Sequence, residues 1–381
     1  MSEEKVSRER RATLKLLVTG IMAGVIAGVG GYFSGTALTP PPKTIMKTVT
    51  ATLTSKTITK TLKPPLVTEL VTATVTAPIP KSEEEVKPEE IKTKTEEKVL
   101  FKHHRRNITF LKFVSSENGM YLLDDSEIAE LKSLNVNGIR ICPLYSLRKD
   151  GTIREDMPEF FFTNLIKKVH HEGFAVFLDI NVGGIPTETG EPVRKYDDPK
   201  HINDLYEIAF YWTKIAEKEK VEFFSPLNEP NLMFVDESLA NQWIEKSQQL
   251  KSIFSGNLVL KFADIGPEKI GDISEYDYLA FDIMWSDARY QELRNHLKMA
   301  VEKGNNLKKK YDLKGFFFGE LGAERSRIDK NVQAQLFKII LEETWGKVDG
   351  YCFLGWSNLE FRFRDNEEAK EIIKEWYARS P

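Results

Sequence analysis

The chain has 381 residues, a formal net charge of −3 and 41% hydrophobic residues. This length exceeds one average domain and suits a single large barrel with additional segments. The near-balanced charge excludes a strongly basic nucleic-acid-binding protein, so no nucleic acid is expected among the partners.

The N-terminal segment has the pattern of a membrane anchor. Residues 1–15 are rich in Lys and Arg, and residues 16–33 form an apolar run without charge. A run of about 18 residues is long enough to span a bilayer as one helix. The basic flank predicts a cytoplasmic tail at 1–15, a signal-anchor at 16–35 and export of the remainder. A cleaved signal peptide is the alternative, because small residues at 34–37 could form a cleavage site.

Residues 36–100 have the composition of a stalk. Threonine recurs up to residue 76, prolines interrupt the segment at 40–42, 64–65, 78 and 80, and Glu and Lys dominate residues 81–98. Such a segment offers little apolar surface for a core of its own. We therefore predict a disordered Thr/Pro-rich and then Lys/Glu-rich linker.

Residues 101–381 contain apolar runs that alternate with helical patterns. The runs expected to be strands are 108–114, 138–142, 175–180, 222–227, 258–262, 278–283, 316–319 and 351–356. The segments expected to be helices are 125–133, 158–171, 202–218, 239–254, 267–273, 290–311, 332–345 and 367–377. Eight such units in about 275 residues predict an α/β fold of the (β/α)8 or TIM-barrel type. A doubly wound open sheet is the alternative, but residues 115–119 are not the glycine-rich phosphate loop that such a sheet usually carries.

Two glutamates follow or end strand-type runs. Glu229 comes after the fourth predicted strand, and Glu320 ends the seventh. A barrel places its chemistry at the C-terminal ends of its strands, and two facing carboxylates are what glycosidic-bond hydrolysis requires. Glu324 is the alternative to Glu320, which we favour because it ends its apolar run directly.

The segment Leu227-Asn228-Glu229-Pro230 resembles the Asn-Glu-Pro signature of the clan A retaining glycoside hydrolases, the cellulase and β-mannanase superfamily. In that clan the acid/base follows strand four and the nucleophile ends strand seven. The resemblance therefore implies double displacement, with Glu229 as the acid/base and Glu320 as the nucleophile. It covers the barrel only, and it implies a carbohydrate substrate and no cofactor.

Three further residues match binding positions of the clan. Arg140 on strand two would lie beside the nucleophile, Asn228 would hydrogen-bond the sugar 2-hydroxyl, and Trp356 after strand eight would lie under the sugar at the cleavage point. Each also has a structural alternative: a core ion pair, a turn before proline, and a core tryptophan.

Two positions depart from the clan pattern. Strand three ends at residues 178–181 without the histidine of many members, and residues 281–285 on strand six lack the tyrosine that orients the nucleophile. An aspartate beside Glu320 would disfavour its ionised form, so Asp282 is a poor replacement for that tyrosine. We expect Asn181 and Trp285 to contact the sugar.

The remaining polar residues give little evidence for a further functional site. The six histidines lack metal-ligand spacing, so no metal site is expected. Cys142 and Cys352 are expected to be buried thiols, because strand alternation places them in different layers of non-neighbouring strands. Lys261 is the only strand lysine that could serve an aldolase-type lyase, for which no phosphate loop is present.

The sequence thus predicts a monomeric, membrane-tethered, extracellular retaining β-glycoside hydrolase that acts on a poly- or oligosaccharide. The alternative from a different functional class is a non-catalytic carbohydrate-binding surface protein on the same barrel.

Overall fold

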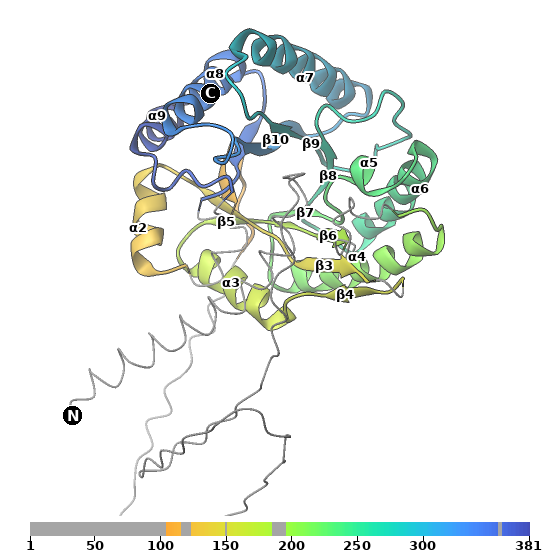
Figure 1. Cartoon of the computed structure of the whole chain (residues 1–381). Coiled ribbons are helices and arrows are strands. Elements are labelled where there is room, and N and C mark those ends of the chain that lie inside the picture. Colours follow the sequence, from red (N-terminus) through yellow and green to blue (C-terminus); the bar gives the residue numbers. More distant parts are fainter. Residues whose placement is uncertain (1–103, 116–122, 149–150, 185–195, 357–359) are drawn as a thin grey trace, which may run out of the picture. The chain divides into compact units, whose positions relative to one another are not determined.

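The computed structural model describes residues 104–115, 123–148, 151–184, 196–356 and 360–381 (Figure 1). The predicted cytoplasmic tail, signal-anchor and stalk, residues 1–100, lie outside the described residues. Among the residues that are described, no helix combines the length and apolar character needed to cross a membrane.

Eight parallel strands close into a barrel, which confirms the predicted barrel over the open sheet. They are, in chain order, β1 (Leu111–Ser115), β2 (Gly138–Ile141), β5 (Ala175–Asp179), β7 (Phe223–Ser225), β8 (Asn257–Ala263), β9 (Tyr278–Met284), β10 (Gly315–Gly322) and β11 (Gly350–Phe353). The ring closes where β1 pairs with β11, with Leu111 opposite Gly350. All eight expected strands are present, with ends that differ by a few residues.

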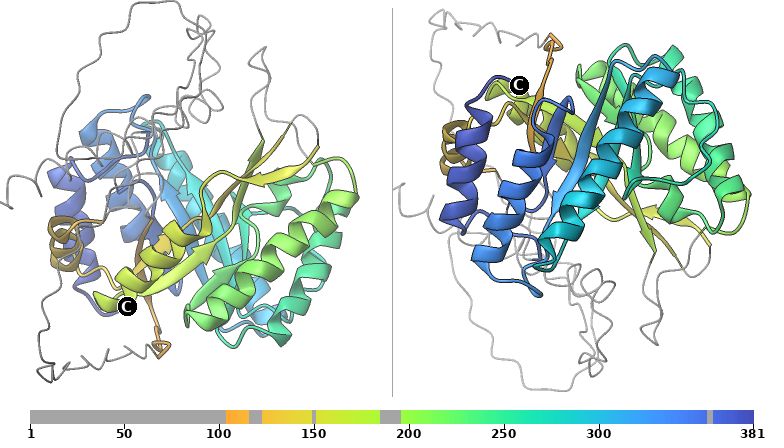
Figure 2. Two further views of the ribbon diagram at one scale, coloured as in Figure 1. Left: turned by 90° about the horizontal axis from the view of Figure 1, so that it is seen from below. Right: turned by 90° about the horizontal axis from the view of Figure 1, so that it is seen from above.

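Helices surround these strands, as Figures 1 and 2 show from three directions. They are α2 (Asp125–Ser133), α3 (Glu159–His171), α4 (Lys200–Lys218), α5 (Pro230–Met233), α6 (Glu237–Ser247), the 3-10 helix η3 (Gln248–Ser252), α7 (Tyr290–Lys310), α8 (Lys330–Thr344) and α9 (Glu367–Tyr377). Four of them begin after an Asp or Asn whose side chain accepts a backbone N–H: Asp124, Asp236, Asp329 and Asn366. Each such cap contributes about 1 kcal/mol to the free energy of unfolding.

The predicted helix at residues 267–273 is wrong. No helix forms between β8 and β9 among the described residues of that connection. That connection contains Gly266, whose φ is 70°, together with Pro267 and Gly271. Glycine and proline disfavour the interior of a helix. Ile273 is nevertheless fully buried, so the connection is anchored by packing without being helical.

A second, three-stranded sheet extends from the barrel strands. It consists of β3 (Leu144–Leu147), β4 (Ile153–Glu155) and β6 (Asn181–Gly184), in the order β4-β3-β6. β3 and β4 form an antiparallel hairpin after β2, and β6 continues the chain directly beyond β5. The segment after the second barrel strand is therefore partly a sheet, which the sequence analysis did not predict.

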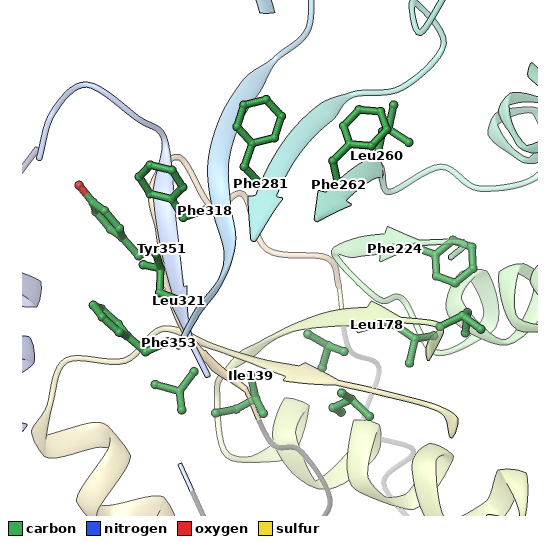
Figure 3. Packing of buried hydrophobic residues seen from close by; sticks show 14 of the residues in the cluster. Ile139, Leu178, Phe224, Leu260, Phe262, Phe281, Phe318, Leu321, Tyr351 and Phe353 are labelled. Carbon is green, nitrogen blue, oxygen red and sulfur yellow. The ribbon is translucent and has the colours of Figure 1, made fainter. Parts of the chain in front are cut away.

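Outward-facing side chains of the strands form the main core against the helices. Figure 3 shows Leu178, Phe224 and Phe281 pointing away from the ring of strands. All three are fully buried in one continuous apolar cluster with residues of the helices. Burying a side chain of this size contributes roughly 1.5–3 kcal/mol, so this layer is the main source of the barrel's stability.

The aromatic rings among the inward-facing side chains of the lower barrel pack edge to face. The ring centroids of Phe113 and Phe223 lie 5.7 Å apart, those of Phe223 and Tyr278 5.3 Å, and those of Phe177 and Phe317 5.7 Å. The interior at this level is a packed core, and it forms the base on which the polar residues above it rest.

Candidate active site

The inward-facing positions change from apolar to polar toward the C-terminal ends of the strands. Two residues beyond Phe113, Phe177 and Phe223 in the lower core lie Ser115, Asp179 and Ser225. In the same way, Lys261 lies two residues beyond Val259, and Asp282 lies two residues beyond Ala280. Since strand side chains alternate with a period of two, these polar residues form one layer inside the barrel mouth, together with Arg140 and Glu320.

Glu320 reaches this layer through a β-bulge. In the pairing of β10 with β9, Phe318 lies opposite Phe281 and Glu320 opposite Asp282, so Gly319 is the extra residue. A bulge redirects the side chains that follow it, and here Gly319 and Glu320 both face the interior. β10 continues to Gly322, so Glu320 lies within the seventh strand rather than at its end as predicted.

Two cations bind the same oxygen of Glu320. Nη2 of Arg140 lies 2.5 Å from Oε1, and Nζ of Lys261 lies 2.6 Å from it. Opposite charges at this distance favour the ionised form of a carboxyl group. Oε2 is the oxygen not engaged in these two ion pairs, and it is available for attack on an electrophile.

Arg140 is held in place by two further residues of neighbouring strands. Its Nε and Nη2 donate to Oδ2 of Asp179 at 2.8 and 2.6 Å, and Nη1 donates to Oγ of Ser115 at 3.0 Å. Burial alone would raise the pKa of Asp179, but the charges of Lys261 and Arg140 outweigh it and hold that pKa below its usual value. The predicted contact between Arg140 and the nucleophile position is present, and so is the core ion pair considered as its alternative.

Lys261 is a residue of this site that the sequence analysis did not assign to it. Its side chain is fully buried, and its ammonium contacts Glu320, Asp282, Asn228 and Asp179. Burial alone would lower the pKa of Lys261, but Asp179, Asp282 and Glu320 outweigh it and raise the pKa well above its usual value. The signal for this residue was present, since it is a charge within an apolar strand, as Arg140 is.

Glu229 approaches the layer from the turn after β7. It has φ of 51° and ψ of 56°, a left-handed conformation that is uncommon outside glycine, and it precedes the short helix α5. Such a backbone conformation costs about 1–3 kcal/mol and is found more often at functional sites than elsewhere. The left-handed turn brings the carboxyl group into the polar layer, where the charges of Lys261 and Glu320 act on it.

The environment of Glu229 suits a proton donor. Burial raises the pKa of its carboxyl group, the charge of Lys261 lowers it, and the charge of Glu320 raises it again, with a net shift upward. The charge of Glu320 acts on Glu229, so the two glutamates belong to one site, in which Glu320 lies between two cations and Glu229 has a raised pKa.

Asp282 lies near the end of the sixth strand, within the residues 281–285 that lack the tyrosine of the clan pattern. Its side chain is buried and pairs with Lys261. Burial is the largest cause that raises the pKa of Asp282 well above its usual value, and the nearby charges of Glu320 and Glu229 add to it. Asp282 is thus a second carboxyl group of the layer whose pKa is raised, although it also forms an ion pair with Lys261.

The predicted sugar-binding residues lie in different settings. Asn228 belongs to the layer: its Oδ1 accepts from Lys261, and its Nδ2 lies 3.5 Å from Oε2 of Glu229.

Trp356 is fully buried, and its indole N–H has no hydrogen-bond partner among the described residues. Asn181 is partly buried at the start of β6. The ring of Trp285 lies 5.8 Å from that of His296 on α7, so its ring contact is with a helix.

The alternative nucleophile has other partners. Glu324 lies 2.7 Å from Nε of Arg327 and accepts a hydrogen bond from Ser326. It makes no ion pair with Arg140 or Lys261 among the described contacts, so Glu320 is the better candidate. Cys142 and Cys352 are both buried thiols, as predicted.

No protein-family model matches the chain, and no curated protein matches it in sequence. Solved structures with the same fold include a GH113 β-1,4-mannanase complex, with 15% identity, TM-score 0.56, and coverage of 71% of this chain and 100% of that one. The GH113 β-mannanase AaManA from Alicyclobacillus acidocaldarius in complex with ManMIm has 11% identity, TM-score 0.56, and coverage of 71% and 98%. Cel5A of Thermotoga maritima in complex with mannotriose has 16% identity, TM-score 0.50, and coverage of 70% and 98%. These glycoside hydrolase structures share the TIM-barrel fold with this chain, which is the fold that the Asn-Glu-Pro resemblance implied.

Proposed function

We propose that the chain is a retaining β-glycoside hydrolase. The observation that carries this proposal is the pair of carboxyl groups with opposite surroundings: Glu320 between two cations, and Glu229 with a raised pKa. Retaining hydrolysis needs one ionised and one protonated carboxyl group facing one bond. The likeness to mannanase structures supports the same reaction class, and it puts β-mannans first among the substrates to be tested.

In the first half of the proposed reaction, Oε2 of Glu320 attacks the anomeric carbon. Glu229 gives its proton to the departing glycosidic oxygen, so the leaving sugar departs as an alcohol and a glycosyl ester of Glu320 forms. Arg140 and Lys261 remain on Oε1, and in the transition state they stabilise the negative charge that is still on the carboxylate. Asn228 is positioned to hydrogen-bond the sugar.

In the second half, Glu229 is ionised and removes a proton from water. The hydroxide so generated attacks the anomeric carbon from the face opposite to Glu320, the ester bond breaks, and Glu320 returns to its carboxylate form. Two inversions at one carbon leave the product with the β-configuration of the substrate.

The test uses the full chain, purified in detergent, against β-mannans, β-glucans, β-galactans and aryl β-glycosides. Proton NMR of the first product should show the β-anomer before mutarotation. Glu320→Gln and Glu229→Gln should each lower kcat by several orders of magnitude on substrates with poor leaving groups, whereas the matched change Glu324→Gln should leave kcat nearly unchanged. An α-anomer as the first product, or full activity in Glu320→Gln, would refute the mechanism.

The second candidate is a carbohydrate-binding protein without catalysis, and the absence of tyrosine from residues 281–285, at the end of the sixth strand, favours it. This candidate predicts oligosaccharide binding by calorimetry with no release of reducing ends. A lyase that uses Lys261 as a Schiff-base amine has less support, because the raised pKa of Lys261 keeps it in the ammonium form, which is not nucleophilic.

We further propose that the enzyme acts outside the cell and is tethered by residues 16–35. The support is the uncharged apolar run with its basic flank. Membrane fractionation should find the chain in the membrane pellet, and protease added to intact cells should remove the barrel. Recovery of a shortened chain from the medium would instead indicate a cleaved signal peptide.

A further inference from the structure

Lys261 contacts four side chains of the polar layer, whereas a simple counter-ion of Glu320 would need to contact only that glutamate. Its Nζ lies 2.6 Å from Oε1 of Glu320 and 3.3 Å from Oδ2 of Asp179, and it also contacts Oδ1 of Asn228 and Oδ2 of Asp282. An ammonium group has only three N–H donors. The four oxygens therefore share these three donors and surround Nζ of Lys261. Nζ thus joins Glu320, the nucleophile candidate, to Asn228, which precedes the acid/base candidate Glu229.

The barrel interior is shaped to hold this lysine. A Cβ atom on Gly319 would lie 3.0 Å from Cε of Lys261 and 2.8 Å from Oδ1 of Asp282. The residue that creates the bulge before Glu320 thus also leaves the space in which the lysine and its aspartate lie. One local feature of β10 both redirects the glutamate inward and admits the cation that it binds.

The charges of the layer require this cation. Around Lys261 lie one further cation, Arg140, and four carboxyl groups: Asp179, Glu229, Asp282 and Glu320. Three of these carboxyl groups, Asp179, Asp282 and Glu320, form ion pairs with Lys261. Removal of Lys261 would take away one of the two cations of the layer, together with the ion pair that Asp282 makes among the described contacts.

We propose that Lys261 is a positioning residue for the hydrolysis, which fixes Oε1 of Glu320 and Oδ1 of Asn228 on one ammonium group and is itself held by Asp282. The inference rests on the proposed function and adds to it a cation from the fifth strand. Asp282 on the sixth strand takes the place of a tyrosine by holding that cation, rather than by contacting the nucleophile directly. With Oε1 fixed by Arg140 and Lys261, Oε2 has one direction in which to attack.

The test compares Lys261→Met with Lys251→Met in the full chain. Lys251 also forms a 2.5 Å ion pair with a buried aspartate, Asp277, but takes no part in the polar layer, so it controls for the loss of a structural ion pair. Lys261→Met should lower kcat about 100-fold, the effect of a misplaced reacting group, with a smaller change in KM. Lys251→Met should lower Tm but leave kcat within about threefold of wild type.

The pH profile separates positioning from stability. Because the charge of Lys261 lowers the pKa of Glu229, Lys261→Met should move the basic limb of kcat/KM to higher pH. Should Lys261→Met fold poorly, the double change Lys261→Met with Asp282→Asn removes the cation together with its counter-charge, and it should fold while still losing kcat.

Two results would overturn the inference, and they differ from failure of the proposed function. Wild-type kcat in folded Lys261→Met, or in the double variant, would show that the lysine is only a structural charge while hydrolysis itself stands. Absence of hydrolysis by the wild type across the substrate panel would remove the proposed function, and with it the role of Lys261.

Discussion

Glu320 on β10 lies in register with Asp282 on β9, and the two side chains share the ammonium group of Lys261. The nucleophile candidate is thus held next to a second carboxyl group, and both carboxyl groups bind one cation. This arrangement differs from a carboxylate oriented by a neutral hydroxyl group.

The first prediction concerns the glycine of the bulge. Gly319→Ala would place a Cβ 2.8 Å from Oδ1 of Asp282 and 3.0 Å from Cε of Lys261. We expect a loss of about 1–3 kcal/mol in the free energy of unfolding and a fall in kcat, because the ion pairs on Glu320 must shift. Chemical denaturation and steady-state kinetics measure the two effects. Gly183→Ala is the control, since its Cβ would meet no closer atom than the Tyr145 carbonyl oxygen at 4.0 Å.

The second prediction concerns the pH dependence of catalysis. Glu229 must carry a proton to assist the leaving group, so kcat/KM should fall as pH rises through its raised pKa. With a dinitrophenyl glycoside, whose leaving group departs without a proton, Glu229→Ala should still form the glycosyl ester and should lose the basic limb. Rate profiles across pH for both proteins are the measurement. A basic limb that persists in Glu229→Ala would assign the proton to another group, with Asp282 the first to examine.

The third prediction concerns two buried tryptophans. The indole N–H of Trp212 donates to the Tyr145 hydroxyl at 2.7 Å, whereas that of Trp356 has no partner among the described residues. Trp356→Phe should therefore cost little folding stability beyond the change in ring size. It should lower kcat/KM about 5- to 10-fold if the N–H donates to a bound sugar, the value of one hydrogen bond.

Trp212→Phe is the matched change and should show the reverse pattern. It should lower the free energy of unfolding by about 1 kcal/mol, because the Tyr145 hydroxyl loses its donor, and should leave kcat/KM unaltered. Equal stability losses in the two variants, with no kinetic effect in either, would make Trp356 a core residue only.

The fourth prediction concerns the opposite end of the barrel, where Arg105 binds Glu217 of α4 at 2.7 Å. Burial alone would raise the pKa of Glu217, but hydrogen bonds from Arg105 and Ser255 lower it from 4.5 to about 2. A lowered folded-state pKa gives stability that is present above the unfolded value and lost as pH falls toward the folded value. Allowing for solvent screening, Glu217→Gln should cost about 1 kcal/mol at neutral pH.

That difference between wild type and Glu217→Gln should shrink as pH falls from about 4.5 and vanish near pH 2, as followed by denaturation at each pH. Glu207→Gln changes an exposed residue of the same helix and should have little effect at any pH. A difference for Glu217→Gln that persists at acid pH would point to lost packing rather than lost charge.

The sequence predicted the barrel well because its strands are short apolar runs buried on both faces and its helices are amphipathic. It also predicted Glu229 and Glu320, since a carboxylate next to an apolar run is conspicuous. The bulge at Gly319 was missed, because a glycine within an apolar run does not by itself show that the strand contains an extra residue, or where it lies. The sheet of β3, β4 and β6 was missed because its strands are only three or four residues long.

Lys261 was missed for a different reason. Its inward orientation follows from alternation, two residues after Val259, and could have been read from the sequence. What alternation does not give is its partners, which come from strands β5, β9 and β10 and from the turn after β7. The expectation for Asp282 was incomplete for the same reason, because the sequence does not show that Asp282 pairs with Lys261.

The closure of the barrel by β1 and β11 has a consequence for how the chain folds. Arg140 belongs to the second barrel strand and Glu320 to the seventh, so their contact spans most of the barrel sequence. Contacts between residues so distant in sequence form late, because a long loop must first be closed. During refolding, the recovery of activity should therefore lag behind the recovery of helical circular dichroism, and enzymatic turnover would report the moment at which the last strands join the first.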